Sequence, residues 1–188
     1  MRGYYLQLRP LDLITTTTFS VLTAIGALVF VPLYPVPITL QTLFTYLSGA
    51  VLGPWLGALS QVIYIALGGV GLPIFAGGKA GFGTLAGPTG GYLFGFVAAS
   101  FAIGKTCHLK KRRTTIRIAG SFTLGTLIIY AFGVAQLTQW MNGNLQSAVT
   151  VGLVPFIIGD TAKVAIGVTI ATRLRGILPH TGLLSEHA

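Results

Sequence analysis

Acidic side chains and cysteine are scarce in this chain of 188 residues. Asp and Glu together number three, charged residues make up 8%, and Cys107 is the single cysteine. One cysteine excludes an intrachain disulfide framework. With 53% hydrophobic residues and a mean hydropathy of +0.80, a water-soluble domain is excluded too, because its surface would be one continuous apolar patch. The composition therefore predicts an integral membrane protein.

Groups suited to catalysis or metal binding are also missing from the apolar segments. The histidines, His108, His180 and His187, fall in a loop or the C-terminal tail, and Asp12 and Glu186 lie near the two ends. No nucleophile with a base and no set of metal ligands can be assembled from them. We therefore expect no enzyme, and no catalytic residue, metal or cofactor.

Six apolar segments are present, separated by proline, glycine or basic residues. They predict a single transmembrane domain over residues 1–188, an all-α bundle with helices at 14–31, 39–53, 55–69, 89–105, 116–140 and 145–172. The second and third segments are kept apart because Gly53 and Pro54 are a stop followed by a restart. A secretory signal peptide is the alternative for the first segment, but its run is too long and ends in VPLYPVP.

Positive charge is concentrated between the apolar segments. The 12 Lys and Arg residues include Arg2, Arg9, a basic loop at 105–113, and Arg173 and Arg175. Six spans place all of these on one side, so the positive-inside rule predicts a multi-pass protein of the cytoplasmic membrane with both termini cytoplasmic. A nucleic-acid-binding patch is the alternative for the basic loop, and we expect no nucleic-acid partner.

Glycine is so frequent from Gly68 to Gly95 that we expect no helix through most of this connector. Its apolar residues indicate that it folds back onto the bundle before the fourth helix, and irregular backbone at membrane depth requires protein or a wet cavity around it. We expect it to line or cover something on the outer side. Lys79 is its single charge, and either serves that site or is a solvated loop lysine.

Two further features involve polar or small side chains in the first helices. Ser20 and Ala24 are four residues apart, which gives the first helix a face that another helix can approach closely, in this chain or in a partner. Gln41 begins the second helix, where its amide faces either a cavity or the lipid headgroups.

The strongest functional signal is a pair of charges in the apolar run PFIIGDTAKVAIG. Asp160 lies midway along the predicted sixth helix, about 20 Å from either end and hence at mid-membrane. A charge there costs about 3 kcal/mol, so it marks a functional site by default. Lys163 follows three residues later on the same helix face, so the two can pair. The alternative is an ion pair that only ties two helices together.

Pro155 precedes this pair in the same predicted helix. Because proline lacks an N–H and crowds the carbonyl four residues earlier, we expect a kink and a free acceptor at Val151.

Three motifs of the chain resemble the BioY family, the biotin-binding S components of energy-coupling-factor vitamin transporters. They are VPITLQTL from Val36, GLPIFAGGKAGFGTLAGPTGGYLFGF from Gly71 and PFIIGDTAK from Pro155. The resemblance implies a six-helix S-component fold that binds biotin from outside, with the connector closing over the vitamin. It also implies a transmembrane coupling protein and two cytoplasmic ATPases as partners.

The resemblance also implies roles for single residues. Asp160 and Lys163 match the family's acid and lysine in the substrate pocket, and suit the N–H donors and carbonyl of biotin's ureido ring. Phe75 and Tyr92 are expected as walls, and Gln41 as a further pocket residue. Lys79 is the candidate for the valerate carboxylate, although a neutral polar side chain is common in that slot. Ser20 and Ala24 are expected to contact the coupling protein.

Two other functions stay open on the sequence. One is a structural or assembly subunit of the membrane, in which the charge pair fixes helix packing. The other is a carrier for another small vitamin-like solute.

Overall fold

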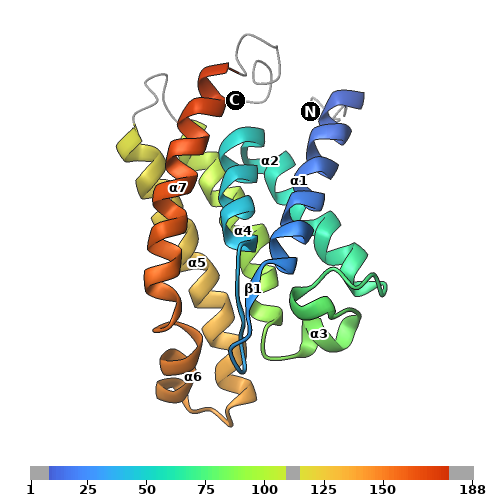
Figure 1. The fold of residues 1–188 in the computed structure, drawn as a ribbon, viewed down its shortest axis with the longest axis vertical. Coiled ribbons are helices and arrows are strands. Elements are labelled where there is room, and N and C mark those ends of the chain that lie inside the picture. The colour runs from blue at the N-terminus through green and yellow to red at the C-terminus, as the bar shows by residue number, and fades with distance from the viewer. Residues whose placement is uncertain (1–8, 109–114, 178–188) are drawn as a thin grey trace, which may run out of the picture.

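The computed structural model describes residues 9–108 and 115–177, which fold into a bundle of α-helices (Figure 1). The helices are α1 (Pro10–Leu28), α2 (Gln41–Gly69), α3 (Phe82–Ala86), α4 (Gly90–His108), α5 (Thr115–Trp140), α6 (Leu145–Gly152) and α7 (Phe156–Ile177). Two short strands, β1 (Phe30–Val31) and β2 (Ile38–Thr39), and a 3₁₀ turn, η1 (Ala76–Gly78), complete the described elements. The predicted all-α class is confirmed.

Helix α1 begins and ends earlier than predicted. It begins at Pro10, since proline is tolerated in the first helical turn and Asp12 accepts a hydrogen bond from the Arg9 N–H at 3.0 Å. It ends at Leu28 because the next residues, Phe30–Val31, pair antiparallel with Ile38–Thr39. The proline-rich connection is thus the turn of a small β-ribbon.

Helix α2 is a hairpin of two arms joined at Gly53. Gly53 has φ 83° and ψ −175°, which an L side chain rarely adopts, and Pro54 follows it. Across the two arms, Gln61 donates to Ser48 at 3.2 Å and Gln41 donates to Tyr64 at 2.6 Å. The arms therefore run antiparallel, as Figure 1 shows on either side of the α2 label. The predicted stop and restart is confirmed, with arms at 41–52 and 54–69.

The glycine-rich connector is more ordered than predicted. It contains η1 and the five-residue helix α3, separated by turns, so no single helix runs through most of it. Four of its glycines have positive φ and supply the turns between these pieces: Gly71, Gly77, Gly78 and Gly81.

The predicted sixth helix is two helices. α6 and α7 are bent by 48° at the residues before Phe156, because Pro155 cannot donate a helical hydrogen bond. The predicted kink at Pro155 is confirmed, but one continuous helix over 145–172 is not, and Asp160 lies in the second turn of α7 rather than at a helix centre. At the break, the Gly152 carbonyl accepts from the Tyr92 hydroxyl at 2.7 Å, one residue from the acceptor expected at Val151.

Three described helices are long and apolar enough to cross a membrane: α1, α2 and α5. The bent pair α6 and α7 makes a fourth if it counts as one span. The chain is therefore a multi-pass membrane protein.

Candidate functional site

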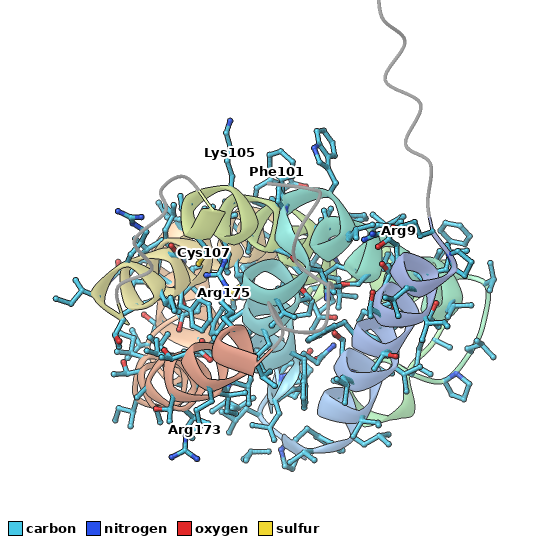
Figure 2. The ribbon with its side chains drawn as sticks, turned by 90° about the horizontal axis from the view of Figure 1, so that it is seen from above. Arg9, Phe101, Lys105, Cys107, Arg173 and Arg175 are labelled. Carbon is cyan, nitrogen blue, oxygen red and sulfur yellow. The ribbon has the colours of Figure 1, made fainter. Side chains whose placement is uncertain are left out.

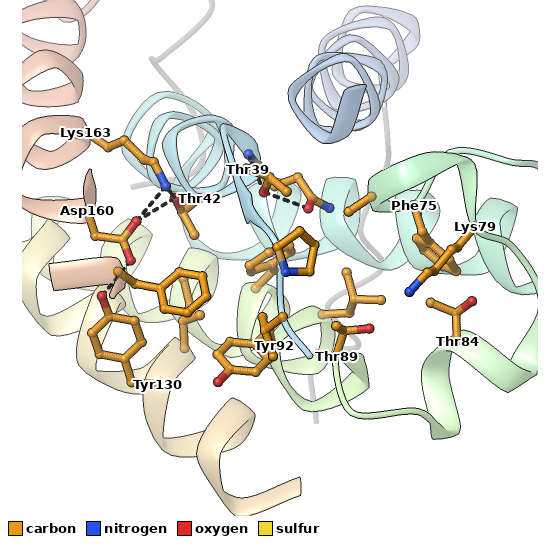
Figure 3. Close-up of a pocket in the computed structure, with 18 residues that line it drawn as sticks. Thr39, Thr42, Phe75, Lys79, Thr84, Thr89, Tyr92, Tyr130, Asp160 and Lys163 are labelled. Carbon is orange, nitrogen blue, oxygen red and sulfur yellow. Dashed lines mark hydrogen bonds and ion pairs between the residues drawn. The ribbon is translucent and has the colours of Figure 1, made fainter. Parts of the chain in front are cut away.

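A cavity lies among α2, α4, α5, α7, the β-ribbon and the connector (Figure 3). Eighteen residues line it. Five come from the segment 36–42, eight from 75–96 and three from 156–163, so the three sequence motifs supply sixteen of them. Segments far apart in the chain thus meet around one cavity.

At one end of this cavity, Asp160 and Lys163 form the predicted ion pair. Lys163 Nζ donates to Asp160 Oδ1 at 2.7 Å, and only 3% and 6% of the two residues are exposed. One turn of α7 separates them, which places both on the face towards α2 and α5. Two full charges are therefore held away from solvent beside an apolar space.

Two hydroxyl groups complete this charged end. Tyr130 Oη, from α5, donates to Asp160 Oδ2 at 2.6 Å. Thr42, from α2, accepts from Lys163 Nζ at 3.2 Å and lies 3.4 Å from Asp160 Oδ1. Each carboxylate oxygen already has a donor, yet a carboxylate has about four acceptor sites and an ammonium three donors. The pair can therefore accept N–H groups and donate to a carbonyl of a planar polar ring.

The middle of the cavity is aromatic and aliphatic. Tyr92 and Phe156 stack with ring centroids 6.4 Å apart, and Phe75, Leu93 and Phe96 line the same space. Because the Tyr92 hydroxyl is bonded to Gly152, Tyr92 presents its ring to the cavity rather than a free polar group. These walls suit an apolar ring system.

Lys79 lies at the other end of the cavity, across from the ion pair (Figure 3). Its backbone pairs with Phe75, whose N–H donates to the Lys79 carbonyl at 3.0 Å. Lys79 is exposed to solvent and lines the cavity. A long ligand with a polar ring at one end and an acid at the other fits this arrangement of charges.

Gln41 lines the cavity and is buried, which favours the cavity over the headgroups as its environment. Its amide Nε2 donates to Tyr64 at 2.6 Å, and its Oε1 accepts from Thr39 at 2.8 Å. All six residues expected to bind substrate (Gln41, Phe75, Lys79, Tyr92, Asp160 and Lys163) therefore line one cavity.

Ser20 and Ala24 lie away from this cavity, on the side of α1 that packs against α2. Ser20 is 2% exposed and donates to the Ser60 carbonyl at 2.6 Å. Ala24 is partly buried against the core. The small face of α1 thus serves packing within the chain at Ser20, while Ala24 keeps some exposed surface.

Sequence reasoning missed Tyr130, Ile129 and Thr42. Tyr130 and Ile129 lie on α5, outside all three motifs, and a tyrosine in an apolar helix has no local signal of its contact with Asp160. Thr42 adjoins Gln41 inside the first motif, and its hydroxyl was the available signal.

Comparisons with known proteins identify relatives of this chain. A sequence model of the BioY family matches residues 4–180. A biotin transporter BioY from Thermotoga maritima is 42% identical over 164 residues, which cover 87% of this chain and 95% of that protein. One from Rhodobacter capsulatus is 39% identical over 170 residues, covering 82% and 89%. The crystal structure of an S-component for biotin from an ECF-type ABC transporter matches with a TM-score of 0.81 at 30% identity, over 88% of this chain and 90% of that one.

Proposed function

The chain belongs to the BioY family, and we infer that it captures biotin for uptake as the substrate-binding subunit of an ECF-type transporter. It is a transport subunit and not an enzyme. The observation that carries this function is the buried Asp160–Lys163 pair at the end of an apolar cavity. A charge pair of this kind is costly as mere packing, because apolar residues of similar size are often as stabilising.

The cavity accounts for each part of biotin. The ureido ring places its N–H groups on the Asp160 carboxylate and its carbonyl within reach of Lys163. The apolar part of the bicyclic ring lies against Tyr92 and Phe156, and the valerate chain extends along the cavity past Phe75. Its carboxylate then meets Lys79, and Gln41 supplies a neutral polar contact at the wall.

The proposed topology has six spans. They are α1, the first and second arms of α2, α4, α5, and the bent pair α6–α7 counted as one span. α1 and α5 begin, and α4 and α7 end, at the same end of the bundle (Figure 1). Figure 2 looks onto this end, where Lys105 and Arg173 project outwards, Arg9 lies beside the start of α1 and Arg175 lies inside. These charges favour a cytoplasmic location for this end and for both termini. Arg2 and the residues 110–113 of the basic loop lie outside the described residues.

This topology places the connector and the β-ribbon on the outer side, over the cavity. Biotin then enters from outside, and the connector is the cover. The support for this arrangement is that Ala76, Lys79 and Thr84 of the connector and Val36 and Pro37 of the ribbon all line the cavity.

The partners are a transmembrane coupling protein and two ATPase subunits, since a subunit of an ECF-type ABC transporter draws on ATP hydrolysis elsewhere in the complex. The proposed contact for the coupling protein stays at the small-residue face of α1. Because Ser20 is buried against α2, Ala24 is its exposed part.

The test is equilibrium binding of labelled biotin to purified protein, with Asp160→Asn and Lys163→Ala beside the wild type. We expect tight binding by the wild type and its loss in both variants. Unchanged binding in both would contradict the assignment and support a structural role for the pair. Competition by other vitamins separates biotin capture from carriage of another small solute.

A further inference from the structure

The connector segment 74–81, which carries Lys79, is hydrogen-bonded to Tyr64 in the second arm of α2. Tyr64 is fully buried, and its hydroxyl donates to the Ile74 carbonyl at 3.1 Å while it accepts from Gln41 at 2.6 Å. One hydroxyl thus joins a residue of the cavity wall to the first residue of the segment. This group has no part in the binding scheme above.

A contact between aromatic rings also joins Tyr64 to this segment. The rings of Tyr64 and Phe75 meet edge to face, with centroids 5.6 Å apart and planes at 86°. Phe75 is 1% exposed, and its ring lies directly over Gly68, where a Cβ atom would collide with it. The Gly68 carbonyl also accepts from the Gly81 N–H at 2.7 Å, which closes the far end of the segment.

Phe75 in turn fixes the backbone of Lys79. The Phe75 N–H donates to the Lys79 carbonyl at 3.0 Å, and the Phe75 carbonyl accepts from Gly78 at 3.0 Å. Gly77 and Gly78, both with positive φ, turn the chain between them. A continuous set of contacts therefore runs from the Tyr64 hydroxyl and ring through Phe75 to the backbone that presents the Lys79 ammonium.

We propose that Tyr64 is a positioning residue that holds Lys79 where it meets the acid end of the ligand, and so sets the preference of the site for a free carboxylate. This role rests on the proposed biotin-binding function. It is a role in specificity, distinct from the ion pair that meets the other end of the ligand. Gly68 supports it by leaving room for the Phe75 ring.

The test compares the affinities of purified protein for biotin and for biotin methyl ester, which has the same rings but no charge. The ratio of the two affinities is the acid preference. Tyr64→Phe keeps the ring and removes both hydroxyl bonds, of which only the one to Ile74 reaches the connector segment, so we expect it to lower the acid preference about three- to tenfold, the effect of that one hydrogen bond. In a Lys79→Ala background, Tyr64→Phe is expected to change the acid preference no further.

Tyr92→Phe is the matched control, because it removes another buried hydroxyl that is bonded to a backbone carbonyl, that of Gly152. We expect it to affect both ligands equally. Gly68→Ala is a second route to the same result, since its methyl group displaces Phe75 without touching the Tyr64 hydroxyl, and it serves if Tyr64→Phe yields no folded protein.

The outcomes separate the two proposals. If the wild type binds neither ligand, the biotin function fails and this role fails with it. If the wild type prefers the acid but Tyr64→Phe and Gly68→Ala weaken both ligands by the same factor, biotin binding stands and the positioning role is overturned. A further fall in acid preference in the Lys79→Ala background also overturns it, because the effect of Tyr64 would then not pass through Lys79.

Discussion

Tyr130 and Asp160, thirty residues apart on α5 and α7, meet through a hydrogen bond of 2.6 Å from the phenol to Asp160 Oδ2. Lys163 occupies the other carboxylate oxygen at 2.7 Å. The plane of the carboxylate is therefore fixed from both sides before a ligand arrives. Fixing a binding group in advance lowers the entropy cost of association, so we expect Tyr130 to contribute to affinity even without touching the ligand.

Tyr130→Phe tests this contribution. It removes the donor and keeps the ring, and a hydrogen bond to a charged group is worth enough to weaken biotin binding about 10- to 100-fold. Titration with labelled biotin measures the change. Tyr34→Phe is the control, because Tyr34 is 96% exposed at the turn of the ribbon, and it should leave affinity unaltered. Equal affinities of Tyr130→Phe and wild type would show that Lys163 and Thr42 orient the carboxylate without Tyr130.

Removal of both charges together distinguishes binding from packing. Asp160→Asn or Lys163→Met alone leaves one buried charge without its partner, and we expect a loss of stability of about 3–5 kcal/mol on removing Lys163. The double variant leaves no uncompensated charge, so its thermal unfolding temperature in detergent should recover towards that of the wild type. Its biotin binding should remain lost. A stable double variant that still binds biotin would assign the pair to packing alone.

The breaks in the helices were predictable from sequence, and most helix ends were not. Gly53 and Pro155 interrupt the chain through their own backbone chemistry, which acts wherever they occur. By contrast, α1 ends at Leu28 because Phe30–Val31 pair with residues seven to nine positions further along, a contact that no local pattern encodes. The size of the break at Pro155 also depends on a distant partner, since Tyr92 from α4 satisfies the Gly152 carbonyl.

The site residues likewise fall into those that the sequence indicated and those that it did not. Asp160 and Lys163 stood out because charges are rare in an apolar run, and the resemblance to a family supplied Phe75, Tyr92 and Lys79. Tyr130 is one of seven tyrosines, and its role exists only because α5 and α7 lie side by side (Figure 3). Residues that act through a contact between helices carry no mark of it in the sequence.

Gly53→Ala is predicted to destabilise the hairpin of α2. A φ of 83° with ψ near 180° is essentially restricted to glycine, so alanine costs on the order of 1–3 kcal/mol there. Thermal unfolding in detergent measures it. Gly120→Ala is the matched control, since Gly120 lies within α5 with no atom near the added methyl group, and alanine favours a helix. If the two variants unfolded at the same temperature, the arms of α2 would not depend on the backbone of Gly53.

Ala24→Leu tests the proposed contact with the coupling protein. Ala24 is partly exposed on α1, whereas Ser20 four residues earlier is buried and bonded to Ser60, so of these two positions Ala24 is the one that can meet a partner. We expect purified Ala24→Leu to bind labelled biotin as the wild type does, and to lose biotin uptake in cells that also make the coupling protein and ATPases. Val21→Leu, which places the same leucine side chain at a position that is 51% exposed, is the control for insertion into the membrane and should retain uptake. A fall in biotin binding by Ala24→Leu would place that face in the core of the chain, because the added methyl groups would then have displaced α2 and with it Gln41 and Thr42 in the cavity wall.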